Sequence, residues 1–507
     1  MIKIFNAGQI REIDNCTIQQ QQISSTDLME RASLAVFELL TGILTTGQEV
    51  FVFAGCGNNG GDALAIARML LTKYYKPKVY LVSAGNKLSP DCHENKGNLE
   101  RLSDIHVISD RKDMPYIPPG SAIIDGLFGS GLNRPLEGVY LDVIEAINYS
   151  GCKVYSIDIP SGMEVADNTH VDPSQMIRAE HVFSFQFPKL SLLLPESNDY
   201  CRRMTIVDIG LSEKCIDAQN TDYYYIQKQD IARMLIPWDR FRHKGNNGRG
   251  LLVAGSFGKM GAAVLASRAC LCTGIGLLTV LIPRCGAEIM QISVPEAMVT
   301  SDRLPEWITD CHGNLSKYTI GIGPGIGTKP ETRNFLEHLL EQCEGIPMVL
   351  DADALNIIAT DDKLAAMIPP GSIITPHPAE FDRLYGTVAA NGYQRLQNAR
   401  ELAARYNIYI VLKGAYTATV CPQQTVYFNS TGNPGMSTGG SGDVLTGIIT
   451  SLLAQKYSPL HSALIGVYLH GLAADLAVKD KSPRSLLPSD IIDHLGVAYT
   501  ELECKSM

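Results

Sequence analysis

Short runs of consecutive apolar residues alternate with helix-length segments along the chain. In the first half the apolar runs are Val50–Ala54, Ala122–Asp125 and Val154–Asp158. Each has the length and composition of a strand that is buried on both faces of a parallel sheet. Apolar residues at helical spacing follow the first run from Ala63 to Leu71. This alternation predicts an α/β fold in which helices cover a mostly parallel sheet.

The second half repeats this alternation in a separate set of strands. Tyr223–Ile226 opens the set, and the polar, featureless segment Leu211–Thr221 precedes it as a linker. The later strands that the pattern predicts are Tyr318–Gly321, Met348–Asp351, Ser372–Thr375 and Ile408–Leu412. Because 507 residues are too many for one core, we expect two α/β domains, over residues 1–215 and 222–507.

Two further segments have patterns of their own. Gln9–Glu30 is typical of two helices, with Thr26 or Asp27 as the N-cap of the second. The apolar segment Ala262–Pro283 is long enough to suggest a membrane span. Arg268 and two glycines interrupt it, so we interpret it as a helix followed by a buried strand.

The composition restricts the class of protein. Hydrophobic residues make up 45% and charged residues 19%, as in ordinary globular proteins. The net charge of −10, without a basic block, argues against an extended nucleic-acid or membrane-binding face. The thirteen cysteines include no Cys-x-x-Cys pair, and Met1–Asp14 is not a signal peptide. We therefore expect reduced thiols, no zinc site and a cytoplasmic enzyme.

The most informative stretch is the glycine-rich run Asn429–Asp443. Pro434 and the glycines exclude a continuous helix or central strand, whereas Val444–Leu453 is apolar at helical spacing. The helix therefore begins near Gly440–Asp443, where free N–H groups and the helix dipole can hold a phosphate. Asp443 would repel a phosphate, which suggests a base that takes a proton from a hydroxyl during phosphoryl transfer. The alternative is that Asp443 only caps the helix.

Polar loops follow the first-half strands. Gly55–Asp62 follows the first strand, Gly126–Gly131 the second and Ile159–Gly162 the third. Because the carboxyl ends of parallel strands meet at one edge of a sheet, these loops are expected to form one binding site. Asp125 and Asp158 end two of the strands, and a purely structural capping role is the alternative for each.

The second-half strands end in polar segments as well. His377 follows one strand and could be a satisfied histidine at a helix start. Lys413 follows another and could be a surface lysine. The segments at the four strand ends are Gly323–Gly327, Asp351–Asn356, Pro376–Glu380 and Lys413–Ala415.

The run Asn433–Asp443 resembles the signature of the NAD(P)H-hydrate dehydratases, a branch of the ribokinase-like superfamily. The resemblance implies a ribokinase-like α/β domain in which Asp443 is the catalytic base and contacts the substrate. It implies further substrate contacts at Gly325, His377, Glu380 and Arg383. It implies ADP, in preference to ATP and with Mg²⁺, bound at Lys413, Gly414, Ala415, Tyr416, Thr417, Gly439, Gly440, Ser441 and Gly442.

The three first-half loops are similar to motifs of the NAD(P)H-hydrate epimerases, the usual fusion partner. The resemblance implies a Rossmann-like three-layer αβα domain that holds a potassium ion through Asn59, Asp125 and Ser161, whose oxygens suit a hard cation. Asp158 is the best candidate for the proton transfer that epimerisation requires. The hydrated nicotinamide nucleotide is implied to contact Asn58, Asn59, Gly60, Gly61, Asp62, Gly129, Ser130, Gly131, Leu132, Asn133, Arg134, Pro135 and Asp158.

Together the resemblances cover nearly the whole chain and imply a bifunctional repair enzyme for hydrated NADH and NADPH. The first domain would interconvert the R and S hydrates. The second would phosphorylate the ring hydroxyl of the S form with ADP and expel phosphate, giving AMP and NAD(P)H. The enzyme is expected to be a homo-oligomer that acts on small molecules, without nucleic acid or membrane partners. A vitamin-precursor kinase, or a first domain that is a noncatalytic binding module, are the alternatives.

Overall fold

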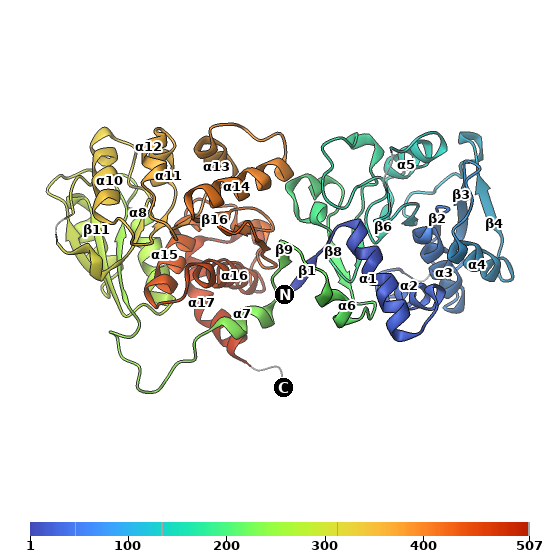
Figure 1. Ribbon diagram of the computed structural model, residues 1–507, viewed down its shortest axis with the longest axis horizontal. Coiled ribbons are helices and arrows are strands. Elements are labelled where there is room, and N and C mark those ends of the chain that lie inside the picture. The colour runs from blue at the N-terminus through green and yellow to red at the C-terminus, as the bar shows by residue number, and fades with distance from the viewer. Residues whose placement is uncertain (46, 133–134, 312, 505–507) are drawn as a thin grey trace. The chain divides into compact units, whose positions relative to one another are not determined.

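The computed structural model describes residues 1–45, 47–132, 135–311 and 313–504. Its contacts define two compact units. The first unit comprises residues 3–221 and 391–393, and the second comprises residues 1–2, 222–390 and those from 394 onward. In each unit, helices lie against a sheet (Figure 1). The α/β class that the sequence predicts is confirmed for both.

The first unit contains seven parallel strands in the order β4-β3-β2-β5-β6-β7-β8. These strands are β2 (Val50–Ala54), β3 (Lys78–Val82), β4 (Ile105–Ile108), β5 (Ala122–Gly126), β6 (Lys153–Ile157), β7 (His181–Phe185) and β8 (Met204–Val207). The helices are α1 (Ala7–Gln21), α2 (Ser25–Thr41), α3 (Asn58–Thr72), α4 (Pro90–Glu100), α5 (Val139–Tyr149) and α6 (Glu213–Ala218). The three predicted strands are confirmed as β2, β5 and β6, which are neighbours, so the loops at their carboxyl ends meet.

Helix α3 begins earlier than its apolar spacing predicts. The expected first residue is Ala63, whereas the helix starts at Asn58. The turn before it is tight, because a Cβ on Gly60 would lie 1.8 Å from the carbonyl oxygen of Gly55. Asn58–Asp62 therefore belong to the start of the helix. The N–H groups of its first residues have no partner within the helix, whereas the Gly61 N–H donates to the Gly57 carbonyl oxygen at 3.1 Å.

Two local predictions are wrong. The N-cap of α2 is Ser24 instead of Thr26 or Asp27, and its hydroxyl accepts from the Asp27 N–H at 3.0 Å. The Asp27 carboxylate accepts in return from the Ser24 N–H, and this capping box fixes the start of the helix. The second error concerns Leu211–Thr221, which contains α6 and is therefore not featureless.

The expectation of reduced thiols is wrong for two cysteines. Cys16 of α1 and Cys215 of α6 form a disulfide, across a sequence separation of 199 residues. Because α1 packs against α6, the two Cα atoms are 5.9 Å apart, within the range that a disulfide can bridge. Among the described residues the other eleven cysteines are free.

The second sheet has eleven strands in the order β1-β9-β18-β17-β16-β15-β14-β13-β10-β11-β12, and β17 runs antiparallel to both of its neighbours. Its strands are β1 (Ile2–Ile4), β9 (Tyr223–Tyr225), β10 (Arg249–Val253), β11 (Leu277–Ile282), β12 (Met298–Ser301), β13 (Thr319–Ile322), β14 (Val349–Leu350), β15 (Ile373–Ile374), β16 (Tyr409–Leu412), β17 (Ala418–Val420) and β18 (Val426–Phe428). Its helices are α7 (Lys228–Met234), α8 (Met260–Cys272), α9 (Ala287–Ser293), α10 (Pro330–Gln342), α11 (Asp353–Ile358), α12 (Asp362–Ala366), α13 (Pro378–Tyr385), α14 (Gly392–Tyr406), α15 (Ser441–Ala454), α16 (Pro459–Ala477) and α17 (Pro488–Glu503). The predicted strands are confirmed here as β9, β13, β14, β15 and β16, with ends shifted by at most one residue.

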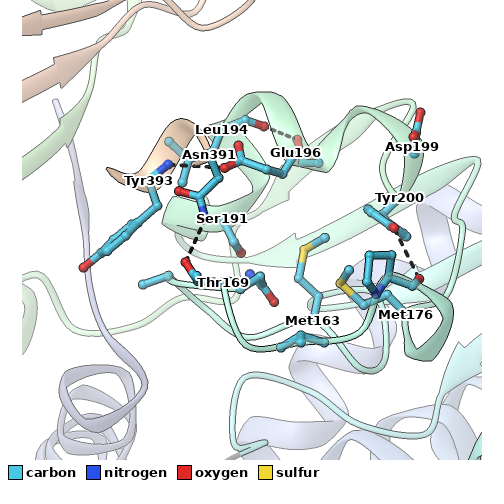
Figure 2. A pocket seen from close by; sticks show the side chains of 15 residues that line it. Met163, Thr169, Met176, Ser191, Leu194, Glu196, Asp199, Tyr200, Asn391 and Tyr393 are labelled. Carbon is cyan, nitrogen blue, oxygen red and sulfur yellow. Dashed lines mark hydrogen bonds between the residues drawn. The ribbon is translucent and has the colours of Figure 1, made fainter. Parts of the chain in front are cut away.

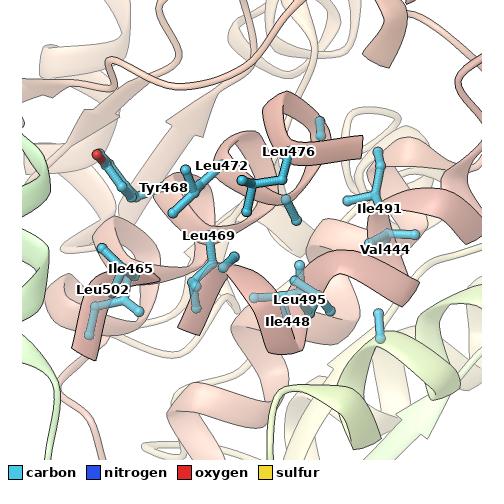
Figure 3. Close-up of a cluster of buried hydrophobic side chains, with 14 of the residues drawn as sticks. Val444, Ile448, Ile465, Tyr468, Leu469, Leu472, Leu476, Ile491, Leu495 and Leu502 are labelled. Carbon is cyan, nitrogen blue, oxygen red and sulfur yellow. The ribbon is translucent and has the colours of Figure 1, made fainter. Parts of the chain in front are cut away.

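Helices α15, α16 and α17 contribute most residues of one extensive apolar cluster in the second unit. Figure 3 shows Val444 and Ile448 of α15 in this cluster, with Val444 next to Ile491 and Ile448 next to Leu495, both of α17. Within the described residues, α16 is the one helix long and apolar enough to cross a membrane, and 83% of its most apolar window is buried in the protein. The apolar segment Ala262–Pro283 forms most of α8 and all of β11, as predicted.

Two candidate active sites

The glycine-rich run forms a tight turn that opens α15. Gly440 is the N-cap residue, and its φ of 97° is a conformation that favours glycine. The helix begins at Ser441, as the pattern predicts. In the part of the chain that the structure describes, no side chain caps α15, so Asp443 does not act as a cap. The N–H groups of the first turn can therefore be donors to an anion.

Lys413, at the end of β16, lies beside this turn. Its Nζ atom is 3.0 Å from Asp351 Oδ1 and 3.8 Å from Glu380 Oε2. A Cβ on Gly442 would lie 3.4 Å from the same nitrogen. Burial lowers the pKa of Lys413, but the Asp351 and Glu380 carboxylates outweigh burial and hold this pKa above its ordinary value. Lys413 is therefore a partly buried, permanently charged cation at the glycine-rich turn, and not a surface lysine.

Asp443 has the properties of a general base. Burial and the Asp351 charge together raise its pKa to about 6, against the opposing effect of the Lys413 charge. Asp351 is buried and accepts a hydrogen bond from Thr446 Oγ1 at 2.7 Å. A carboxyl group with a pKa near 6 is mostly ionised at neutral pH, yet it is basic enough to take a proton from a reacting hydroxyl.

Asp353 organises the loop that follows β13. Its Oδ2 atom accepts from the Gly327 N–H at 2.9 Å and lies 3.1 Å from Lys259 Nζ. Gly325 in this loop has a φ of 64°, and its carbonyl oxygen accepts from Ser256 Oγ at 2.7 Å. A Cβ there would lie 3.0 Å from the Lys259 carbonyl oxygen, so glycine is required.

The segment after β15 forms the start of α13. His377 is its N-cap, and its Nδ1 atom accepts from the Glu380 N–H at 3.3 Å, while Glu380 Oε2 accepts from the His377 N–H at 2.9 Å. The interpretation of His377 as a satisfied histidine at a helix start is thus correct for its Nδ1 atom. Glu380 reaches Lys413, whereas Arg383 donates to Asn356 Oδ1 at 2.8 Å.

The predicted nucleotide segment after Lys413 forms the turn between β16 and β17. Thr417 Oγ1 donates to the Gly414 carbonyl oxygen at 3.0 Å. The Tyr416 ring lies 6.3 Å from the Tyr225 ring, and Ala415 stands between the two hydrogen-bonded residues in the sequence. Lys413 connects this segment to the glycine-rich turn.

His470 is a buried residue behind the turn that sequence reasoning missed. Its Nε2 atom is 3.2 Å from Ser441 Oγ. Burial lowers the pKa of His470 to about 4, and the Lys413 charge adds to this effect, so the imidazole is neutral at physiological pH. The signal in the sequence is a histidine within the apolar segment 463–474 of α16.

In the first unit, a cavity of about 650 Å³ opens at the carboxyl ends of β2 and β5. The predicted substrate residues that line it are Asn58, Asn59, Asp62, Gly129, Ser130, Gly131, Leu132 and Asp158. Gly60, Gly61 and Pro135 are not on its wall, and Asn133 and Arg134 lie outside the described residues. Helix α1 adds residues that sequence reasoning missed because they belong to no motif: Ala7, Ile10, Arg11 and Asp14.

Asp158 is held in a fixed position on the wall of this cavity. Its backbone has a φ of 67°, a strained conformation that concentrates at functional sites. Its Oδ1 atom is 2.5 Å from Lys189 Nζ, and its Oδ2 atom accepts from the Ser130 N–H at 3.0 Å. Burial opposes its ionisation, but Lys189 outweighs burial and the pKa of Asp158 lies below its ordinary value. Asp158 is therefore an ionised carboxylate, and its hydrogen bonds are not those of a cap on the Pro160–Gly162 turn.

The three predicted potassium ligands lie around Phe128–Gly129. Ser161 Oγ donates to Asp125 Oδ1 at 2.5 Å and accepts from the Phe128 N–H at 2.9 Å. A Cβ on Gly129 would lie 3.3 Å from Asn59 Oδ1. Burial raises the pKa of Asp125, and no described Lys or Arg forms an ion pair with it. A buried carboxylate without a cationic partner, together with neighbouring amide and hydroxyl oxygens, fits a hard monovalent cation.

A second cavity of about 340 Å³ in the first unit contains none of the predicted residues. Figure 2 shows Met163, Met176 and Tyr200 on its wall. Asn391 Nδ2 donates to Thr169 Oγ1 at 2.7 Å on another side. Its lining is mostly apolar, which distinguishes it from the polar cavity at the strand ends.

The chain matches two family models. Residues 25–191 match the model described as "YjeF-related protein N-terminus". Residues 250–496 match the model described as "NAD(P)H-hydrate dehydratase". The first match contains Asp125, Asp158 and the strand-end wall of the polar cavity but not the residues of α1. The second contains the glycine-rich turn with Asp443.

Relatives with the same two-part organisation cover almost the whole chain. The Bifunctional NAD(P)H-hydrate repair enzyme Nnr of Moorella thermoacetica is 33% identical over 99% of this chain and 97% of its own length. The enzyme of the same name from Coxiella burnetii is 34% identical over 98% and 99%. A solved structure, the ADP/ATP-dependent NAD(P)H-hydrate dehydratase of Bacillus subtilis co-crystallised with ATP/Mg²⁺, is 30% identical, covers 55% of this chain and 99% of its own, and has a TM-score of 0.47. The chain therefore belongs to the bifunctional NAD(P)H-hydrate repair enzymes, which confirms the resemblance noted in its sequence.

Proposed function

We propose that this repair enzyme carries out its two reactions in its two units, with the epimerase in residues 1–215 and the dehydratase in residues 222–507. The observation that carries the proposal is the partly buried Asp443, a base beside the N–H groups of the Gly439–Gly442 turn and the Lys413 cation. Within this turn the Ser441 N–H donates to the Thr438 carbonyl oxygen at 3.3 Å. This combination suits phosphoryl transfer to a hydroxyl. The negative charge on the transferring phosphoryl group would develop next to N–H donors that are already oriented toward it.

In the dehydratase reaction, the oxygen of the ring hydroxyl attacks the terminal phosphorus of ADP. The Asp443 carboxylate takes the proton of this hydroxyl as the attack occurs. AMP leaves, and the N–H groups of Gly439–Gly442 and the Lys413 ammonium stabilise the charge on the transferring group. The phosphate ester is a better leaving group than hydroxide, so phosphate departs with the electron pair of its bond to the ring carbon. The neighbouring ring carbon then loses a proton, and the electron pair of that C–H bond restores the ring double bond. Gly325, His377, Glu380 and Arg383 are the proposed contacts to the substrate.

Mg²⁺ is proposed to enter with the nucleotide. The described residues hold no group of three or more His, Cys, Asp or Glu side chains that could bind a metal ion by themselves. Asp351 and Glu380 are already paired with Lys413. Because Mg²⁺ is commonly held by substrate phosphates with only one or two carboxylates, this site fits a nucleotide-borne ion. Gly414–Thr417 would contact the nucleotide beside Lys413.

In the epimerase reaction, the R and S hydrates are proposed to interconvert in the polar cavity of the first unit. Asp158 would be a fixed negative group against the substrate, and Asn58–Asp62 and Gly129–Pro135 would bind the nucleotide. Asn59, Asp125 and Ser161 would hold potassium, which when bound would neutralise Asp125 and present a positive charge at the strand ends.

One assay tests the whole proposal. Purified protein is incubated with a mixture of R and S hydrates and ADP, and reduced-nicotinamide absorbance, AMP and free phosphate are followed. The proposal expects complete repair with AMP and phosphate released in equal amounts. Accumulation of a phosphorylated alcohol without free phosphate would instead identify a kinase. Repair that stops at the S fraction would identify the first unit as a noncatalytic module.

We also propose that the enzyme acts in the cytoplasm as a homo-oligomer, without nucleic acid or membrane partners. The net charge of −10 supports the absence of an extended anionic partner. Helix α2 leaves Leu34 and Leu39 exposed, which supports association between copies. Light scattering after size-exclusion chromatography, with and without reductant, tests the oligomeric state; a monomeric mass would contradict it.

A further inference from the structure

Helix α1 brings a second aspartate to the polar cavity of the first unit. Asp14 lines the cavity together with Asp158 and Asp62. The other charged side chains on the wall are Arg11, from α1 itself, and Lys87. Lys189 stands behind Asp158 and is buried. Asp14 is therefore one of three carboxyl groups that can face a ligand in this cavity.

The three carboxyl groups differ in their capacity to exchange a proton near neutral pH. Burial and the Asp158 charge together raise the pKa of Asp14 to about 6, against the opposing effect of the Lys189 charge. Lys189 keeps Asp158 ionised by holding the pKa of Asp158 below its ordinary value. Burial raises the pKa of Asp62 well above its ordinary value, although a hydrogen bond from Ser33 at 3.0 Å opposes the rise. Asp14 and Asp158 are thus two carboxyl groups with separated pKa values, which is the usual arrangement of an acid–base site.

The contacts of Asp158 also oppose a role in proton exchange. One of its oxygens is 2.5 Å from Lys189 Nζ and the other accepts from the Ser130 N–H. Taking up a proton would weaken the ion pair with Lys189. No described side chain holds Asp14 in an ion pair, and it lies on a helix that borders the cavity.

We propose that Asp14 is the catalytic residue that exchanges the proton with the hydrated ring in the epimerase reaction, while Asp158 is a fixed acceptor that positions the ring. This inference rests on the proposed epimerase function of the cavity. Asp14 takes the hydroxyl proton as the bond between the ring nitrogen and the hydrated carbon breaks. The electron pair of that bond goes to nitrogen, the carbon becomes an aldehyde, and Asp14 gives the proton to nitrogen.

Rotation of the aldehyde then exposes its other face, and the reverse steps close the ring as the opposite epimer. Nitrogen attacks the carbonyl carbon, Asp14 takes the nitrogen-bound proton, and the oxygen receives it as the new hydroxyl. One carboxyl group is sufficient because the same proton travels in both directions. No oxidant, reductant or additional reactant is consumed.

The test uses the full-length enzyme with mixed hydrates and ADP, in which an initial fast phase reports dehydration and a second phase reports epimerisation. For Asp14→Asn we expect the second phase to slow by about 100- to 10,000-fold, toward the spontaneous rate, with the first phase unchanged. Asp14→Glu is expected to restore part of the second phase. Glu12→Gln, which changes an exposed carboxylate of the same helix, is the matched control and is expected to alter neither phase.

The pH profile of the second phase separates Asp14 from Asp158. The wild-type rate is expected to rise with pH through an apparent pKa near 6. In Asp158→Asn a negative charge next to Asp14 is removed. The rise of the epimerisation rate is therefore expected at a lower pH, with part of the epimerase activity retained. A rise that stays in place in Asp14→Asn, or a fast second phase in that variant, would overturn the inference. If the wild type itself shows no second phase above the spontaneous rate, the epimerase function fails instead.

Discussion

A single methyl group at Gly442 is expected to separate phosphoryl transfer from folding. The Cβ of Gly442→Ala would lie 3.4 Å from Lys413 Nζ and 3.6 Å from Asp351 Oδ2, which are ordinary contact distances. Gly442 is in the first turn of α15, where alanine has the greater helix propensity. We therefore expect the free energy of unfolding to stay constant or to rise by up to about 1 kcal/mol.

The same methyl group would occupy the space beside Lys413 that a phosphoryl group needs in order to reach the N–H groups of the turn. Loss of one such donor typically costs about 100- to 1,000-fold, and we expect kcat/KM for dehydration of the S hydrate to fall by this factor. The assay is initial-rate kinetics with S hydrate and ADP, combined with urea unfolding of the same sample.

Gly447→Ala, in the middle of α15, is the matched control. Its Cβ would lie 2.1 Å from the Ala266 carbonyl oxygen, so this variant is expected to lose stability because of a backbone clash. Near-normal kcat/KM in Gly442→Ala would refute the anion site at the turn. Destabilisation of Gly442→Ala to the same extent as the control would refute the geometry.

Three further perturbations address the base, the ion site and the disulfide. Asp443→Asn is expected to slow dehydration by about 100- to 10,000-fold. It is also expected to stabilise the fold at pH 7, because the folded protein holds the Asp443 carboxyl at a pKa raised from 3.8 to about 6. Ionisation of this carboxyl lowers the free energy of unfolding of the wild type by up to about 3 kcal/mol above pH 6, and this loss is absent below pH 4. Urea unfolding at pH 4 and pH 7 checks it, and equal pH dependence in both proteins would contradict it. In Asp125→Asn, potassium is expected to lose its effect on epimerisation and on the thermal midpoint, measured against sodium, while dehydration of the S hydrate is unchanged; a persistent potassium effect would exclude Asp125 as a ligand. Reductant is expected to destabilise the first unit by about 5 kcal/mol in the wild type, because the Cys16–Cys215 bond closes a loop of roughly 200 residues, and to have no effect on Cys16→Ser.

The strands and their polar ends could be predicted because local patterns determine them. Val50–Ala54 is a continuous apolar run, and every residue of β2 is buried. The helix after the glycine-rich run begins at Ser441 because glycines and Pro434 exclude an earlier start. The start of α3 could not be predicted in the same way, since Asn58–Asp62 are poor helix formers that tertiary packing brings into the helix.

Features that depend on contacts between segments far apart in the chain could not be predicted from the sequence. Asp14 lies in a polar helix without a motif, and only the packing of α1 beside the strand ends reveals it as a cavity residue. The pairing of Cys16 with Cys215 depends on the contact between α1 and α6. The ion pairs of Lys413 with Asp351 and Glu380 could not be predicted either. They depend on the order of the strands, which the pattern of apolar residues does not determine.

The Cys16–Cys215 disulfide also determines how the first unit responds to mechanical force. When the two ends of the chain are pulled apart, tension passes through the sulfur–sulfur bond and not through the chain between Cys16 and Cys215, which are 199 positions apart. At about 3.5 Å per residue, roughly 700 Å of chain is thus shielded from extension until the bond is reduced. In a single-molecule stretching experiment the oxidised protein would release only the length of its second unit and termini. Reductant would add one further extension step of this size, so the redox state of one bond determines whether the strand-end loops of the polar cavity are extended. The cavity residues Ala7–Asp14 of α1 precede Cys16 and lie outside the shielded segment.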